Sequence, residues 1–267
     1  NRPALGTVSL RASASYGEHN ERMLNATVNV PLGSIAALRV SGFDQAQDGF
    51  GRNVTLDGLV GSTHDYGGRA RLLVEPSSTL SMLLSADYAH HWDSSVRTPV
   101  SGQPAAVTAM LRELGVFPGP KSADTGDGSF GEIATEEWGT SLNITAKLGS
   151  HELRSISALR FTGYDNSTPV NLLPLDKYAY VPFNLGELDT DKVSQEIHLA
   201  SPTGGFVEYV VGAFYNRLHA RQTQLQWATL GQPLYRPNGT PLPTLYALTG
   251  AIGVNANASL FDTVNET

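Results

Sequence analysis

Few side chains in this sequence stand at spacings that support catalysis. Asp124-Thr-Gly126 has the residue types of the aspartic-protease triplet, in which an aspartate after an apolar strand moves a proton during peptide hydrolysis. The preceding Lys121-Ser-Ala123 is not an apolar strand, so we interpret the triplet as part of a flexible loop. Neither a G-x-S-x-G pattern nor a phosphate-binding loop pattern occurs. The sequence therefore predicts no enzyme.

Candidate metal ligands are equally sparse. His90 and His91 are adjacent, so on a strand their side chains point to opposite faces and cannot bind one ion together. Asp124 and Asp127 stand among glycines, but the spacing of an EF-hand calcium loop is absent. The chain has no cysteine, which excludes disulfides and thiolate metal sites. We expect no metal site and no cofactor.

Composition narrows the class of partner. The net charge of −7 argues against nucleic acid. Charged residues make up 16% of the chain, below the roughly 25% of average soluble domains. The longest apolar runs, such as residues 209–215, are far shorter than the about 20 residues of a membrane helix, whereas a membrane barrel needs no such run. Both ends of the sequence look cut, so we interpret the chain as part of a longer protein.

Alternation of apolar and polar residues predicts about nine strands. In residues 7–16, Val8, Leu10 and Ala12 alternate with polar residues, and a strict period of two is typical of a strand with one apolar and one polar face. Further strands are predicted at residues 22–32, 36–41, 69–75, 80–92, 138–148, 152–164, 193–201 and 207–217.

The connections between these strands alternate in length. Tight turns are predicted at residues 32–34, 76–78, 149–150 and 202–205, and long loops at 44–67, 93–136, 165–192 and 219–267, with one short connection at 17–20. In an up-and-down sheet, alternate connections lie at opposite ends, so the long loops share one end, as in outer-membrane barrels. Seven aromatic residues are predicted near that end as an interfacial girdle: Tyr16, Phe43, Tyr88, Trp92, Trp138, Tyr164 and Tyr215. Charged residues of the polar faces, Arg11, Arg39, Asp87 and Lys147, are expected to face a barrel interior.

Several short motifs occur in the order found in the TonB-dependent outer-membrane receptors. The stretch 194–217, SQEIHLASPTGGFVEYVVGAFYNR, resembles the mid-barrel hairpin of that family. Asn1-Arg2-Pro3 is similar to the segment that ends the plug domain and leads into the first strand. The other matches are Tyr16-Gly17, Asn20-Glu-Arg22, Asn29 to Gly33, Ala37-Leu-Arg39, Gly42-Phe43, Asp48-Gly-Phe50, Asn53, Gly68 to Leu72 and Ala86-Asp-Tyr88.

This resemblance implies that residues 1–267 are the first part of a 22-stranded barrel closed by a plug, with the plug and the remaining strands outside the chain. About nine strands cannot close such a barrel, so an open, curled sheet is expected. The family lies in the bacterial outer membrane, contacts its lipid, and imports scarce ligands such as iron-siderophore complexes, cobalamin or glycans. Energy reaches it through TonB, which acts on the plug. An iron-siderophore complex is the first expectation for the ligand, although the sequence itself does not identify one.

Ligand contact is predicted in the two longest loops. Cationic and aromatic groups at a barrel mouth suit an anionic or aromatic-rich ligand. The candidates in or beside 93–136 and 219–267 are His91, Arg97, Arg112, Lys121, Arg221, Trp227, Tyr235 and Arg236.

Two other functions are compatible with the pattern. A passive outer-membrane porin has the same alternation and turn asymmetry but no plug. A soluble or surface β-domain that binds carbohydrate has strands that alternate equally well. A plug-sized segment ahead of Asn1 favours the receptor over both.

Overall fold

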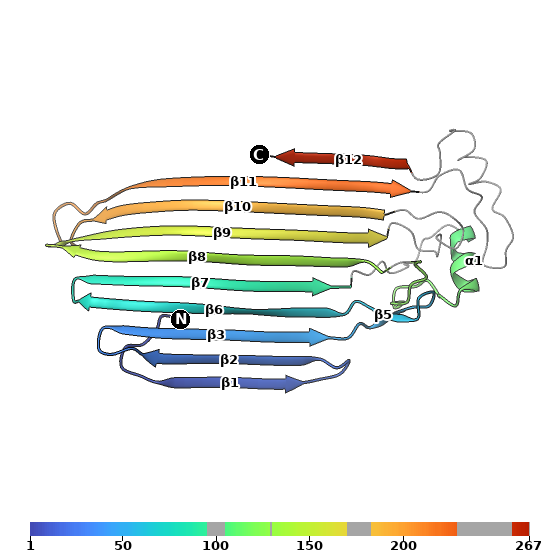
Figure 1. Cartoon of the computed structure of the whole chain (residues 1–267), viewed down its shortest axis with the longest axis horizontal. Coiled ribbons are helices and arrows are strands. Elements are labelled where there is room, and N and C mark those ends of the chain that lie inside the picture. The colour runs from blue at the N-terminus through green and yellow to red at the C-terminus, as the bar shows by residue number, and fades with distance from the viewer. Residues whose placement is uncertain (95–104, 129, 170–182, 229–257, 267) are drawn as a thin grey trace.

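The computed structural model describes residues 1–94, 105–128, 130–169, 183–228 and 258–266. Within them, ten strands form one antiparallel sheet in chain order (Figure 1). They are β1 (Ser9–Tyr16), β2 (Arg22–Pro31), β3 (Ala36–Gln47), β6 (Thr63–Ser77), β7 (Leu80–Asp93), β8 (Glu132–Leu148), β9 (His151–Pro169), β10 (Phe183–Ala200), β11 (Val210–Ala228) and β12 (Ala258–Glu266). The predicted all-β up-and-down fold is confirmed, with one strand more than the nine that alternation predicts.

The sheet is open. Among the described residues β1 pairs with β2 alone and β12 with β11 alone, so the two edge strands do not meet. This confirms the expected partial barrel. The described helix α1 (Ala105–Glu113) and the small strands β4 (Gly51–Asn53) and β5 (Gly58–Val60) lie outside the large sheet. No helix in the described part of the chain is both long and apolar enough to cross a membrane.

The connections at one end of the sheet, which we call the turn end, are short, and those at the other, the loop end, are long except for the short β1–β2 connection (Figure 1). Gly33 and Gly149 adopt positive φ values of 86° and 65° in two of the tight turns. These angles are strained for most residues with a Cβ, which favours glycine at both positions. The predicted separation of turns and loops is therefore correct.

The loops are shorter than predicted because the strands continue beyond the alternating stretches. β10 begins at Phe183, inside the predicted loop 165–192. β11 extends to Ala228 and β12 covers Ala258–Glu266, so the prediction of one loop over 219–267 is wrong at both ends. Near the loop end both faces carry polar residues, as at Asp189 and Thr190, and the apolar period disappears from the sequence. Backbone pairing continues there because hydrogen bonds in a ladder do not depend on side-chain polarity.

The two faces of the sheet differ in chemistry. On the apolar face, the register brings aliphatic side chains together, as where Leu84 pairs with Leu72 and Leu142. On the polar face, Arg39 pairs with Arg71, and Asp87 lies between Arg69 and Gly139. Large apolar side chains remain exposed on the apolar face, including Leu10, Val40, Leu84 and Leu159. Such a surface needs an apolar environment outside the chain.

Aromatic residues of the apolar face form an oblique line. Tyr88 pairs with Trp138 and Trp138 with Phe161, and the latter rings stack at 5.8 Å between centroids. On β6, Tyr66 lies one step nearer the loop end than the residue that pairs with Tyr88. On β11, Tyr215 lies nearer the turn end than the residue in the same register row as Phe161. The strands of a barrel tilt relative to its axis. Residues at one height along that axis therefore occupy shifted register positions on successive strands, as these aromatic residues do.

The predicted girdle is correct for Tyr16, Tyr88, Trp92 and Trp138, which share the apolar face near the loop end. Tyr215 lies in the first half of β11, because this strand is longer than predicted. Phe43 and Tyr164 lie on the polar face instead. The Phe43 ring covers Gly67, where an added Cβ would come within 2.8 Å of the ring.

The first residues of the chain lie across the polar face. Asn29, which is buried, donates from its side-chain amide to the carbonyls of Ala4 and Thr7 at 2.9 and 2.6 Å. Its Oδ1 accepts from the Ala4 amide at 2.9 Å. Arg2 forms an ion pair with Glu75 on β6. Residues 1–7 thus reach β1 from the polar side of the sheet, and Pro3 is buried there.

Candidate functional site

Two loop-end connections, far apart in sequence, fold into one unit. We call it the cap and define it as residues 48–62, 105–128 and 130–131. β4 and β5 pair as a short hairpin, and Asn53 also forms a parallel bridge with Thr125. The Val54 amide donates to the Thr125 carbonyl at 2.9 Å, and the Thr125 amide donates to the Arg52 carbonyl at 3.0 Å. The second connection therefore adds a third strand-like segment to the hairpin.

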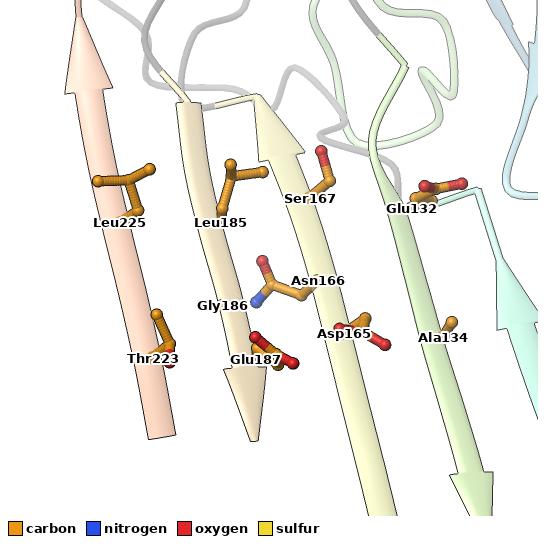
Figure 2. A pocket seen from close by; sticks show the side chains of 10 residues that line it. All are labelled: Glu132, Ala134, Asp165, Asn166, Ser167, Leu185, Gly186, Glu187, Thr223 and Leu225. Atoms are coloured by element: carbon orange, nitrogen blue, oxygen red, sulfur yellow. The ribbon is translucent and has the colours of Figure 1, made fainter. Parts of the chain in front are cut away.

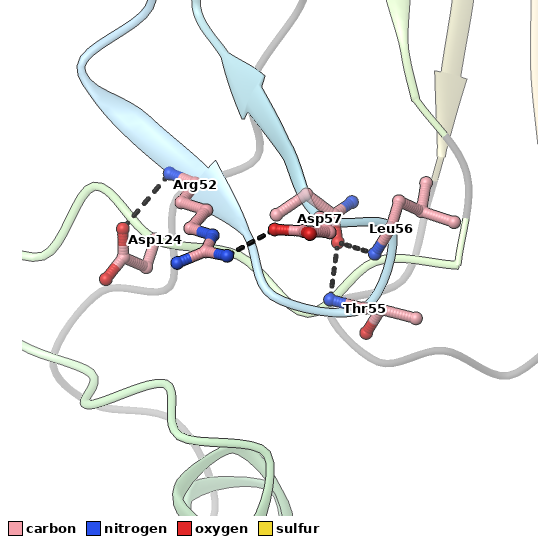
Figure 3. Close-up of polar contacts among 6 residues, drawn as sticks. Arg52, Thr55, Leu56, Asp57 and Asp124 are labelled. Atoms are coloured by element: carbon pink, nitrogen blue, oxygen red, sulfur yellow. Dashed lines mark hydrogen bonds and ion pairs between the residues drawn. The ribbon is translucent and has the colours of Figure 1, made fainter.

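Asn53 is the centre of the cap and is fully buried. Its Nδ2 donates to the Asp127 carbonyl at 2.9 Å. Its Oδ1 accepts from the amides of Thr55 and Leu56, which Figure 3 labels, at 3.0 and 3.1 Å. The Arg52 amide donates to Asp124 Oδ1 at 3.0 Å. One asparagine thus closes the hairpin turn and fixes the second connection to it.

Glycine makes the close approach of the two connections possible. A Cβ on Gly51 would lie 2.0 Å from the Ala123 carbonyl oxygen. Thr125, Gly126 and Asp127 are buried against the hairpin. The loop predicted for Asp124-Thr-Gly126 is present as irregular backbone, but it is packed rather than free.

Helix α1 has a well-defined end. The Val116 amide donates to the Leu111 carbonyl at 2.9 Å and the Gly115 amide to the Arg112 carbonyl at 3.0 Å, with Gly115 at φ 88°. These two bonds form a Schellman motif, which needs a left-handed residue after the helix. Met110, Leu111 and Val116 are buried around this turn.

The surface of the cap combines aromatic and cationic groups. Phe117 is 69% exposed, and Phe50 and Phe130 are also exposed. Arg112 and Lys121 are exposed on the same unit. The Asp57 carboxylate hydrogen-bonds to Arg52 and raises the pKa of its guanidinium, so Arg52 stays cationic but already has a partner. Aromatic faces and free cations can bind anionic or aromatic ligands.

The polar face carries a groove of about 480 Å³ toward the loop end. Asp87 lies within it and forms ion pairs with Arg160 at 2.7 Å and Arg69 at 3.7 Å. Asn25, Phe43 and Glu137 are among the other residues that line it. The groove offers positive charges, negative charges and neutral hydrogen-bonding groups.

Another groove of about 550 Å³ crosses β8 to β11 near the loop end (Figure 2). The register places the carboxylates of Glu132, Asp165 and Glu187 on the same face as the apolar rows. Figure 2 shows Leu225 and Leu185 on neighbouring strands, with Glu187 on the strand of Leu185, Asp165 on the next strand and Glu132 on the strand beyond it. This groove therefore lies on the opposite side of the sheet from the polar-face groove.

The structure places the predicted contact residues in different settings. His91 lies on the polar face of β7, hydrogen-bonded to Asp65 and 3.5 Å from Asp93, while His90 faces the other way beside Tyr66, as predicted. Arg112 lies in α1 and Lys121 in the cap. Arg221 and Trp227 lie in β11 rather than in a loop, because this strand extends to Ala228.

Arg221 pairs in register with Asp189 on the apolar face. Arg97, Tyr235 and Arg236 lie outside the described residues. No cluster of three or more metal-binding side chains occurs in the part of the chain that the structure describes.

Sequence reasoning missed the exposed phenylalanines of the cap and the groove around Asp87. The alternation did place Asp87 on the polar face.

No protein-family model matches the sequence, and no curated protein matches it either. Solved structures do match in fold. The ferric yersiniabactin uptake receptor FyuA from Yersinia pestis aligns over 90% of this chain and 34% of its own, with a TM-score of 0.61 and 13% identity. The ferripyoverdine receptor of the Pseudomonas aeruginosa outer membrane, bound to ferripyoverdine, aligns over 100% and 34%, with a TM-score of 0.62 and 11% identity.

The siderophore receptor PiuA from Acinetobacter baumannii aligns over 99% of this chain and 38% of its own, with a TM-score of 0.57 and 14% identity. The fold of this chain is that of part of the β-barrels of these structures. This chain spans little more than a third of each of the three receptors. The expected resemblance to TonB-dependent receptors is thus confirmed at the level of fold.

Proposed function

We propose that this chain is part of the barrel of a bacterial outer-membrane receptor that binds and imports a scarce small ligand. The observation that carries the proposal is the likeness in fold, over 90–100% of the chain, to receptors described as taking up or binding siderophores. The apolar face then contacts lipid, and the polar face lines the interior. The second part of the proposed receptor is a plug that occupies this interior and transmits energy from TonB.

A ferric siderophore is the ligand class that best suits the cap. Siderophore complexes are commonly anionic or aromatic, and the cap presents the exposed Phe117 together with Arg112 and Lys121. Its position at the loop end puts it on the outer side of the membrane if the tight turns face the periplasm. Recognition by this surface followed by passage along the polar face is the proposed route.

The experiment uses cells that depend on the complete receptor. A strain that lacks the receptor and a complemented strain are supplied with radioactive iron on a panel of siderophores, and with labelled cobalamin and glycans. Accumulation in the complemented strain alone, and its loss when TonB is deleted, support the proposal. Uptake that survives TonB deletion, together with open-channel conductance in planar bilayers, indicates the passive porin instead.

A set of substitutions tests the cap more sharply than its deletion, because removing residues 100–130 also removes Thr125 and leaves Asn53 without its partner. The variant Phe117→Ser, Arg112→Gln, Lys121→Gln changes only exposed groups. We expect its ligand affinity to fall at least about tenfold, or about 1.4 kcal/mol, at an unchanged level in the outer membrane. Lys147→Gln at the turn end is the matched control. Unchanged affinity in the triple variant would remove the cap surface from the site.

A further inference from the structure

Two arginines face each other on the polar face. Arg39 on β3 and Arg71 on β6 are direct partners in the register. Asn29 lies beside Arg39, and Ser85 lies beside Arg71. Like charges directly opposite on neighbouring strands destabilise a sheet. The pair therefore costs stability unless an anion lies between or above the two guanidinium groups.

The nearby carboxylates already have other partners. Asp87 is held by Arg160 and Arg69, and Glu75 is held by Arg2. Within the described residues, neither Arg39 nor Arg71 forms an ion pair. The Nε of Arg71 is buried and has no hydrogen-bond partner there. A buried donor that is left unpaired costs free energy, about 1–3 kcal/mol in general and more when the group is charged.

The polypeptide itself approaches this positive site. Asn1 lies close enough to Arg71, Arg39 and Arg69 for their charges to act on its backbone nitrogen. Residues 1–7 cross the same face, where they bond to Asn29. Main chain therefore lies within the electrostatic reach of the arginine pair. Among protein groups, the side chains that complement two guanidinium groups are those of aspartate and glutamate.

We propose that Arg39 and Arg71 form an anion site on the inner wall of the barrel, and that it holds a carboxylate of the polypeptide packed against this wall. The guanidinium fork of arginine matches the two oxygens of a carboxylate, so one carboxylate can bridge both residues. The site rests on the proposed function, because a barrel interior filled by polypeptide brings the carboxylate to it.

The anion site is tested by whether the thermal midpoint falls or rises when one of the two arginines is replaced. The complete receptor is purified in detergent, and its thermal midpoint is compared with those of Arg39→Gln, Arg71→Gln and the double variant. If a carboxylate bridges the arginines, each single variant melts lower, by at least about 2 °C. If no anion is held, removal of one of two opposed positive charges leaves the midpoint unchanged or raises it, and the proposal is overturned.

Two controls separate the anion site from general damage and from a free ligand. Arg154→Gln removes a positive charge elsewhere on the same face and should shift the midpoint less. Excess succinate, a small free dicarboxylate, should raise the midpoint of the wild type alone if the carboxylate comes from solution, and should change nothing if the carboxylate is resident. An equal loss in the Arg154 control would overturn the site. The midpoint needs no transport, so this result is independent of the uptake experiment.

Discussion

At the scale of single residues, Asn53 holds the two connections of the cap together, which its place in a glycine-rich loop does not indicate. We expect Asn53→Ala to open the cap, because the substitution leaves the Asp127 carbonyl and the Thr55 and Leu56 amides without their bonds. Unpaired buried groups cost about 1–3 kcal/mol each. Trypsin should then cleave after Arg52, whose backbone is hydrogen-bonded to Asp124 and Thr125 in the intact cap.

The cleavage is measured on whole cells that carry the complete receptor, by the size of the fragments. Asp57→Asn is the matched control, since it weakens only an exposed ion pair and asparagine tolerates the positive φ of 56° at this position. Equal resistance of the Asn53 variant and the wild type would show that the cap does not depend on this side chain.

Sequence reasoning could not have found the role of Asn53. Its partner Asp127 lies 74 positions away. The motif match around Asn53 marked the position but gave no contact. His90 and His91 were easier to place, because the period of a strand alone separates adjacent side chains. Residues whose role follows from local geometry were predicted, and those whose role follows from a contact between two loops were not.

At the scale of elements, neighbouring residues of one strand test the assignment of the two faces. Leu142 lies on the apolar face of β8 and Ser141 on the polar face. Leu142→Arg puts a charge toward lipid and should destabilise the barrel by about 2–4 kcal/mol if the site is near mid-membrane. Ser141→Arg should change stability much less. The measurement is heat-induced unfolding of the complete receptor extracted from outer membranes. Equal losses in both variants would contradict the assignment.

Strands could be predicted where their two faces differ in polarity, but not where both faces are polar. Alternation predicted the hairpin at 194–217 because Ile197 and Leu199 share one face with Val211. It failed in the first part of β10, where Asp189 and Thr190 make both faces polar. The sequence signal comes from the environment of each face, whereas the strand is held by its backbone bonds, so the structure extends further than the signal.

At the scale of the whole molecule, the order of short and long connections predicted the up-and-down fold. No single strand would have been sufficient, because soluble sheets alternate in the same way. The cap was not predictable from this order, since it joins two connections that are separated by β6 and β7. Topology fixes which connections share an end of the sheet, but the contacts between them depend on particular groups such as Gly51 and Asn53.

The open edges lead to the last prediction. Every residue of β1 is exposed, and the outer edge of β12 meets no other strand in the described part of the chain. The apolar face exposes Leu10 by 76% and Leu159 by 46%. Unpaired strand edges bind other chains, and apolar surface of this extent needs lipid or detergent.

We therefore expect residues 1–267, produced alone in aqueous buffer, to aggregate or to remain unfolded. Sedimentation velocity and thermal melting followed by circular dichroism provide the measurement, and the complete receptor in detergent is the folded control. If the complete barrel is closed as proposed above, every edge is paired, so it should sediment as one species and melt cooperatively. A monodisperse monomer of residues 1–267 with a cooperative melt would instead mean that this sheet buries its apolar face by itself, and the soluble carbohydrate-binding domain would then become the better description.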